Sequence, residues 1–148
     1  MPQGQKAPAM SDPRYGSAEQ IMALSAPKLA ALLKDPSATL YAKAKACQRL
    51  AVVGDRAAVP ALASLLGDEK LSHYARTGLE PIPDPSVDDA LRAALPKLKG
   101  KLLTGVINSI GQRRDPKAIE PLARLIYDAD PEVARAASAA LARIRPGI

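Results

Sequence analysis

The residues best suited to chemistry are few in this chain, which has one histidine, His73, and one cysteine, Cys47. Metal binding and catalysis by clustered side chains need several such groups to converge on one point. A Ser–His–Asp triad around His73 is formally available, but the sequence has no nucleophile elbow, no Walker loop and no GxGxxG motif. These residues predict a non-enzymatic protein with no metal and no cofactor, in which Cys47 is a small buried hydrophobic residue.

A second set of candidate residues is polar and recurs along the chain at matching positions. Aligned columns read Ala44, His73, Thr104, Arg135; then Gln48, Thr77, Asn108, Ala139; then Val52, Pro81, Gln112, Arg143. Thr and Asn are weaker helix formers than Lys or Glu, so ligand binding is one reason for their presence on helices. The candidate binding residues are His73, Thr77, Thr104, Asn108, Gln112 and Arg135. The alternative is that they are ordinary solvent-facing residues of polar helix faces.

Basic residues form a third candidate set, in a chain whose net charge is +6. Lys97, Lys99 and Lys101 lie at one end of a predicted helix, and Arg113-Arg114 and Lys117 lie about 18 Å away at its other end. Nucleic-acid binding requires a continuous basic stripe, and single-strand binding adds stacking aromatic residues, which make up only 3% of this chain. Nucleic acid is therefore an alternative partner, beside the simpler interpretation of a solvated basic surface.

The elements that must position these residues repeat with a period of about 30 residues. Segments that begin at Asp55, Asp84 and Asp115 share apolar positions, and a weaker copy begins at Ser25. Each segment is followed by an i, i+4 apolar pair, at Ala46–Leu50, Ala75–Leu79, Val106–Ile110 and Ala137–Leu141, with offsets of 29, 31 and 31 residues. This spacing predicts stacked helix–turn–helix units.

Composition and punctuation favour helices throughout. The chain has no Phe and no Trp, so its core must be built largely from Leu, Ile, Val and Ala. Asp-Pro dipeptides at 35, 84, 115 and 130 combine an N-cap with a proline suited to the first helical position, and Gly54, Gly67, Gly100 and Gly111 suit helix ends or turns. The expected helices are 17–33, 37–53, 57–66, 70–80, 86–95, 101–112, 116–127 and 131–144. The prolines between Glu80 and Pro85 predict a rigid connector.

The segment Asp115 to Leu141, with its Asp-Pro start, Ala-Ile-Glu-Pro-Leu-Ala centre and Pro-Glu-Val-Ala-Arg-Ala-Ala second helix, resembles the HEAT repeat. It is similar in particular to bacterial HEAT-like repeats of the phycobiliprotein-lyase-type subgroup, and the resemblance extends over about 25–145. It implies an all-α protein, an α-solenoid coiled as a right-handed superhelix of about four units, with a concave face lined by the second helix of each unit. The resemblance implies no particular activity, since most members of the family are scaffolds. The prediction is therefore a non-enzymatic scaffold that binds a protein or peptide in its concave groove, with a bilin lyase or chaperone as a further alternative.

The domain organisation follows from the same pattern. Residues 1–16 are expected to form a flexible lead-in, and 17–148 a repeat domain with units at about 17–53, 54–80, 84–112 and 115–145. No segment is apolar enough to span a membrane, and the compartment stays open between cytoplasm and periplasm or exterior. The alanine-rich helix over 131–144 is apolar around most of its circumference, which predicts either a longer array or self-association through this helix.

Overall fold

The computed structural model describes residues 11–145, which are mostly helical and include only one short two-stranded sheet. The α-helices are α1 Ala18–Met22, α2 Ala26–Leu33, α3 Leu40–Val53, α4 Val59–Ala63, α5 Ser72–Leu79, α6 Pro85–Ala94, α7 Gly100–Arg113, α8 Ile119–Leu125 and α9 Pro131–Ile144. Three single-turn 3-10 helices accompany them: η1 Arg56–Ala58, η2 Leu95–Lys97 and η3 Pro116–Ala118. The expectation of an all-α protein is confirmed.

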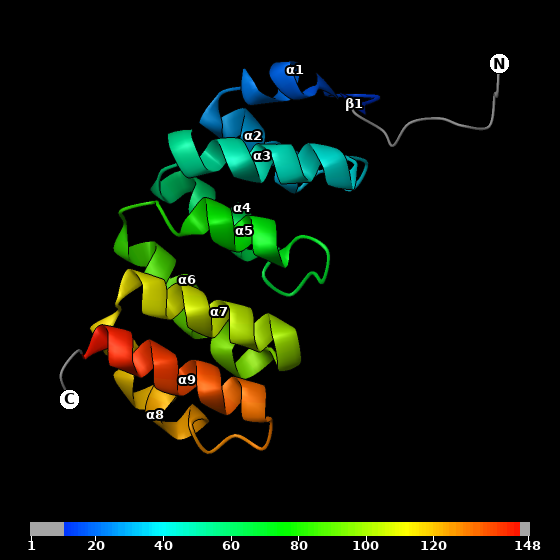
Figure 1. Cartoon of the computed structure of the whole chain (residues 1–148). Helices are drawn as coiled ribbons and strands as arrows, with labels where there is room; N and C mark the ends of the chain where they lie inside the picture. The colour runs from blue at the N-terminus through cyan, green and yellow to red at the C-terminus, as the bar shows by residue number, and fades with distance from the viewer. Residues whose placement is uncertain (1–10, 146–148) are drawn as a thin grey trace, which may run out of the picture.

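The helices follow one another through space in the order of the chain. Figure 1 shows α3, α5, α7 and α9 side by side at the front, with α2, α4, α6 and α8 behind them. Helix α3 contacts α5, α5 contacts α7, and α7 contacts α9. The side-chain hydrogen bonds that join α5 to α7 and α7 to α9 connect residues 29 to 33 positions apart. This separation matches the offset that the sequence predicts between equivalent helices.

Aspartate N-caps begin helices at three of the four predicted Asp-Pro dipeptides. The prediction is wrong at Asp35, because its carboxylate bonds to Ser37 in a turn and α3 begins later, with Thr39 as its N-cap. The carboxylates of Asp84, Asp115 and Asp130 accept backbone N–H groups two residues on, at 2.9–3.0 Å. Asp55 does the same for Ala57 at 3.0 Å. Each bond satisfies a first-turn donor that has no partner within the helix.

Three of the predicted helices differ from those of the structure, and a proline explains each difference. The expected helix 17–33 is broken into α1 and α2, because Pro27 lacks an N–H and its ring would clash with the carbonyl of the preceding turn in a continuous helix. The expected helices 57–66 and 116–127 each open with a 3-10 turn, η1 and η3, before α4 and α8 begin. This switch places Pro60 and Pro121 in the first turn of an α-helix, where no N–H is needed.

The predicted flexible lead-in over 1–16 is wrong for the part that is described, whereas its first ten residues lie outside the described range. Strands β1 Ser11–Asp12 and β2 Gly16–Ser17 pair antiparallel, and Gly16 has a φ of 89° that favours glycine. Asp12 is 3% exposed, and its carboxylate accepts the backbone N–H and hydroxyl of Thr39, both at 2.8 Å. Because Thr39 is the N-cap of α3, Asp12 ties the hairpin to the first long helix.

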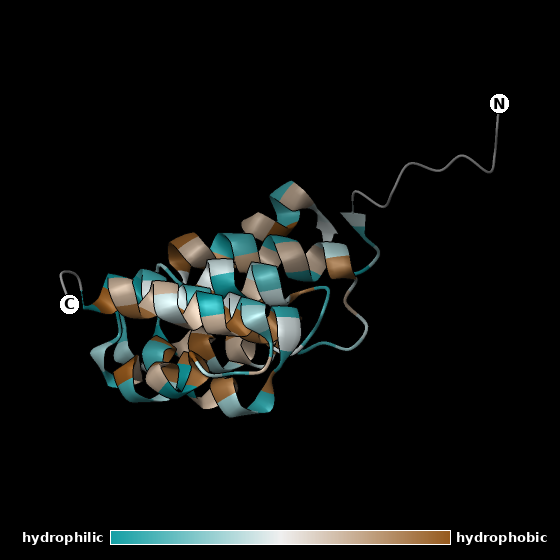
Figure 2. Cartoon of the chain, turned by 60° about the horizontal axis from the view of Figure 1, so that its bottom comes forward, coloured by the Kyte–Doolittle hydropathy of each residue, from teal (hydrophilic) through white to brown (hydrophobic). Residues whose placement is uncertain are grey.

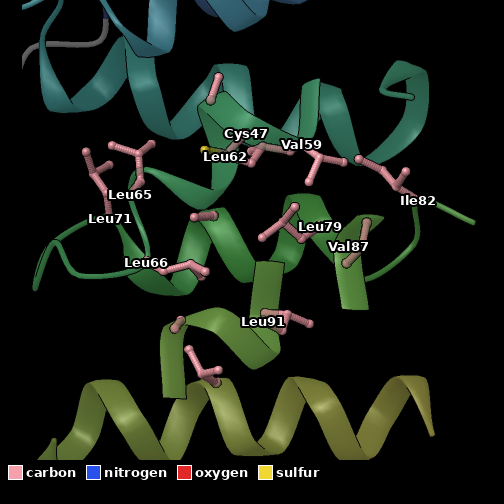
Figure 3. Packing of buried hydrophobic residues seen from close by; sticks show 14 of the residues in the cluster. Cys47, Val59, Leu62, Leu65, Leu66, Leu71, Leu79, Ile82, Val87 and Leu91 are labelled. Carbon is pink, nitrogen blue, oxygen red and sulfur yellow. The ribbon is translucent and has the colours of Figure 1, made fainter. Parts of the chain in front are cut away.

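A continuous aliphatic core runs between the two rows of helices. Figure 3 shows part of it, where side chains of α3, α4, α5 and α6 meet around Leu62, Leu79 and Leu91, all fully buried. The expectation that Gly111 ends a helix is wrong, since this glycine lies inside α7. A Cβ there would lie 3.0 Å from the Cα and Cβ of Ala140, so glycine allows α7 and α9 to approach closely.

Candidate functional site

The predicted polar residues lie on three neighbouring helices, α5, α7 and α9, and five of the six are exposed. His73 and Thr77 are on α5, Thr104, Asn108 and Gln112 on α7, and Arg135 on α9; Thr104 is half-buried. Their helices therefore lie side by side, as the aligned columns require. The residues themselves do not all meet at one place.

Asn108 and Gln112 are brought together in a cleft between α7 and α9, with a volume of about 380 Å³. We call this the amide cleft; its other walls include Glu80, Ala139, Ala140 and Arg143. Arg143 donates a hydrogen bond from Nη1 to Oε1 of Gln112, across the two helices. These two residues occupy the same aligned column, 31 positions apart, so the column itself held the signal that Arg143 belongs with the candidate residues.

The other predicted residues lie outside the amide cleft. The Thr77 hydroxyl donates to the His73 carbonyl at 2.9 Å within α5, and the His73 ring packs edge-on against Tyr74. Arg135 pairs with Glu132 on its own helix at 2.7 Å, and both side chains are about 70% exposed. The structure thus supports a smaller cluster, Asn108, Gln112 and Arg143, than the stripe predicted from the sequence.

A polar network underlies one wall of the cleft, where α5 meets α7. The Ser109 hydroxyl donates to Glu80 Oε2 at 2.6 Å, and Arg76 Nη1 donates to the Gly105 carbonyl at 3.2 Å. A Cβ on residue 105 would lie 2.7 Å from Arg76 Nε, so the glycine makes room for the guanidinium. Burial lowers the pKa of Arg76, and the charge of Glu80 opposes that shift. The bond from Ser109 therefore holds the Glu80 side chain, and Glu80 lines the cleft together with Asn108.

Arg113 is not part of an accessible basic patch, contrary to the grouping suggested by the sequence. Its side chain is 13% exposed and donates from Nη1 to the carbonyls of Glu80 and Ile82 and from Nη2 to the carbonyl of Asp84, at 2.7–3.1 Å. Its Nε and Nη2 also bind both oxygens of Asp88, at 2.7 and 3.1 Å. The prolines of the connector prevent a helix there, and Arg113 donates to the Glu80 carbonyl and adds a second donor to the carbonyls of Ile82 and Asp84, which also accept backbone N–H groups.

A second arginine joins α6 to the start of the next helix pair. Arg92 donates from Nε to Asp115 at 2.5 Å and from Nη2 to Asp89 at 2.7 Å. Burial acts to lower the pKa of Arg92, but its hydrogen bonds to Asp115 and Asp89 raise it overall. Asp115 also caps η3, so one carboxylate serves both the helix start and the contact between helices.

The groups that most often perform chemistry are dispersed in the described part of the chain. Cys47 is fully buried, and burial raises the pKa of its thiol to about 12, which keeps it protonated and unreactive at neutral pH. Between residues 11 and 145, no group of three or more His, Cys, Asp or Glu side chains is placed to hold a metal ion. No helix in the same range has the length and apolar character needed to cross a membrane.

Comparison with known proteins adds no assignment. No protein-family model matches the chain, and no curated protein matches it significantly.

Proposed function

We propose that this chain is a non-enzymatic interaction module that binds a protein or peptide along the row of helices α3, α5, α7 and α9. In this proposal the fold is an α-solenoid of about four HEAT-like units, near 17–53, 54–80, 84–112 and 115–145. The observation that carries the function is the amide cleft, where Asn108, Gln112 and Arg143 from equivalent helices meet in one exposed depression. The repeat period and the hydrogen bonds 29 to 33 residues apart support the assignment of units.

The chemistry of the amide cleft suits an extended peptide. Each side-chain amide of Asn108 and Gln112 can donate and accept, which matches the alternating N–H and C=O groups of a peptide backbone. The Arg143 guanidinium, now bonded to Gln112, can exchange that partner for a ligand carboxylate in a charge-assisted bond. A volume of about 380 Å³ lies in the range of small binding pockets, so we expect one or two ligand side chains to enter.

The test is a selection of linear peptides from a random displayed library on the immobilised protein, followed by fluorescence polarisation with the selected peptides. We expect Asn108→Ala and Gln112→Ala to weaken binding by about tenfold each, the value of one ligand hydrogen bond in a partly desolvated cleft. Arg124→Ala is the matched control, because Arg124 is exposed on α8 and does not line the cleft. Circular dichroism should show that all variants stay folded.

Two results would count against the proposal. One is a selection that yields no peptide with saturable binding. The other is peptide binding that is unchanged in Asn108→Ala and Gln112→Ala but abolished in Arg135→Ala. Arg135 is exposed on α9 and does not line the amide cleft, so this result would place the binding site elsewhere.

The nucleic-acid alternative has weaker support, because Arg113 is engaged by five hydrogen bonds to the connector and Asp88. Phosphate contacts make affinity fall steeply with salt, so a salt titration of binding to random DNA distinguishes this alternative. Absorbance titration with a linear tetrapyrrole tests the bilin alternative, for which the described residues offer no specific feature.

A further inference from the structure

A larger hollow lies on the other row of helices, between α4 and α6. Its volume is about 770 Å³, twice that of the amide cleft. Its floor is apolar and made mostly of small side chains: Ala63, Ala90, Ala93, Ala94, Leu98 and Leu102. We call it the alanine groove. It shares no lining residue with the amide cleft, so nothing argued below depends on the function proposed above.

The groove is far larger than the hollow at the preceding junction of the stack. The preceding junction, where α2 meets η1 and α4, leaves a hollow of only about 80 Å³. At the groove, α6 gives way to the 3-10 turn η2 at Leu95, and α4 ends at Ala63, before a turn that contains Gly67. A Cβ on Gly67 would meet only Leu98, at 3.6 Å, so the absence of a side chain at Gly67 leaves this part of the groove open.

The floor of the groove leaves apolar surface in contact with solvent. Ala63, Ala90, Leu98 and Leu102 are half-buried, and Ala93 is exposed. In the stacked rows, comparable apolar positions such as Leu62 and Leu91 are fully buried by a neighbouring helix. Small floor residues permit the closest approach of helix axes, so the shape and chemistry of the groove suit a helix from outside the described residues.

The charged residues at the rim of the groove indicate which charge the bound helix should carry. Lys97 and Lys99 are exposed along one side, and neither forms an ion pair within residues 11–145. Glu69 is the one acidic side chain among the residues that line the groove in the described structure. A ligand with carboxylates beside its apolar face would therefore meet two unpaired ammonium groups, whereas a basic ligand would meet repulsion.

We propose that the alanine groove binds an acidic amphipathic helix of a partner protein. The helix lays apolar side chains spaced i, i+3, i+4 and i+7 on the alanines and on Leu98 and Leu102. Glutamate or aspartate residues flanking that face pair with Lys97 and Lys99. The groove thus gives the protein a second docking surface, formed mainly by α4, α6 and η2 and completed by Leu102 at the start of α7.

The absence of tryptophan from this chain provides a direct assay. The probe is a synthetic peptide of about 15 residues, with leucines and one tryptophan on one helical face and glutamates on the rest. Excitation of that tryptophan reports the peptide alone, and entry into the groove should shift its emission to the blue in a saturable manner. Lys97→Glu combined with Lys99→Glu should weaken binding at least about tenfold, as should Ala93→Glu, which places a carboxylate on the exposed floor.

The matched control is Lys28→Glu combined with Lys34→Glu, which makes the same change in net charge at exposed positions on and next to α2. It should bind the peptide as the unaltered protein does, and a peptide with lysine in place of glutamate should not bind. The proposal is overturned if the tryptophan emission does not shift, or if the control variant loses as much affinity as the groove variants. It is likewise overturned if the lysine peptide binds equally well, or if the groove variants bind the glutamate peptide as the unaltered protein does. It is also overturned if a long-chain fatty acid saturates the groove and the peptide does not compete with it.

Discussion

Arg113 shows how one residue can hold together segments that the backbone cannot join by itself. The connector between α5 and α6 contains Pro81 and Pro83 and makes no helix, so its carbonyls lack the regular hydrogen bonds of a helix. The Arg113 guanidinium uses all its N–H donors on three of those carbonyls and on Asp88. Few other side chains present so many donors in a fixed plane, so lysine is a poor substitute here.

We expect Arg113→Ala to reduce the free energy of unfolding by about 3–5 kcal/mol, because it leaves the Asp88 carboxylate and the Glu80 carbonyl without their donors and removes a second donor from the carbonyls of Ile82 and Asp84. Arg113→Lys should restore only a part of this loss, since an ammonium cannot reach both groups in the same geometry. Urea unfolding followed by circular dichroism measures both values.

The neighbouring residue is the control for this substitution. Arg114 has a φ of 55° and ends α7 in the left-handed conformation. Glycine relieves the steric strain of that conformation, so Arg114→Gly should stabilise the protein by about 0.5 kcal/mol. A similar loss at both arginines would mean that general charge, and not the bonds of Arg113, accounts for the effect.

At the scale of elements, the N-terminal hairpin is held by a buried carboxylate. Burial acts to raise the pKa of Asp12, but hydrogen bonds from Thr39, Arg14 and Tyr15 outweigh it and lower the pKa to about 2. Hydrogen bonds from Tyr15 and Ser37 similarly lower the pKa of Asp35 to about 2. Both carboxylates therefore favour the folded state when they are ionised.

We predict that the hairpin loosens in acid. A carboxylate with a folded pKa of about 2 and an ordinary value of 3.8 contributes its full stabilisation above the ordinary value and loses it as the pH falls towards 2. Amide hydrogen exchange of residues 11–17 should thus increase, beyond its intrinsic pH dependence, between about pH 4 and pH 2. In Asp12→Asn the same amides should already exchange faster at neutral pH, with a smaller further change on acidification.

Helix packing at the C-terminal end depends on a glycine that the sequence suggests only as a terminator. Gly111→Ala introduces a methyl group 3.0 Å from the Ala140 backbone, and the backbone has no flexible end that could move aside. We expect a net loss of about 1–2 kcal/mol in stability, because the strain exceeds the gain of about 1 kcal/mol in helix propensity.

Gly67→Ala is the comparison for that variant. Its new methyl group would meet only Leu98, at an ordinary contact distance of 3.6 Å. Its stability should stay within about 0.5 kcal/mol of the unaltered protein, and thermal unfolding of the two variants checks the difference. Equal stability of both variants would contradict the close approach of α7 and α9.

At the scale of the whole molecule, the two ends of the stack differ. The hairpin and α1 cover the N-terminal end, where Ile21 is fully buried. At the other end, α8 and α9 enclose a groove of about 320 Å³ lined in part by Ile119, Ala123, Ile126 and Leu141, all half-buried. Figure 2 turns this end forward and shows hydrophobic segments interspersed with hydrophilic ones along its helices.

Self-association through this end stays a prediction from the sequence. Four of the nine apolar residues of α9 are buried within the chain: Val133, Ala136, Ala137 and Ala140. The largest apolar side chain of α9 beside the groove is the half-buried Leu141, so we expect a contact between copies to centre on it. Light scattering should then show a concentration-dependent rise in mass that Leu141→Lys removes. Leu40→Lys, which alters a leucine exposed by 47% at the start of α3, should leave the rise unchanged.

Much of the helical framework could be predicted because its determinants are local. Asp84, Asp115 and Asp130 cap helices within two residues of themselves, and the period of about 30 residues sets which helices become neighbours. The interior prolines also act locally, but predicting their effect requires knowing that a 3-10 turn can precede the α-helix. The sequence also placed Asn108 and Gln112 on one helix face, one turn apart.

The tertiary structure decided which of these residues meet, and which are already engaged in hydrogen bonds or packing within the protein. Arg113 resembles an exposed basic residue until its partners, about 25 to 33 positions away, are known. Gly111 resembles a helix end until Ala140 is placed against it, and Arg143 joins the amide cleft only because α9 packs on α7. The sequence determined where helices begin, end and recur, since backbone hydrogen bonds and caps span a few residues. Partner choice and cleft shape depend on how side chains fill the space between helices, which only the packed molecule determines.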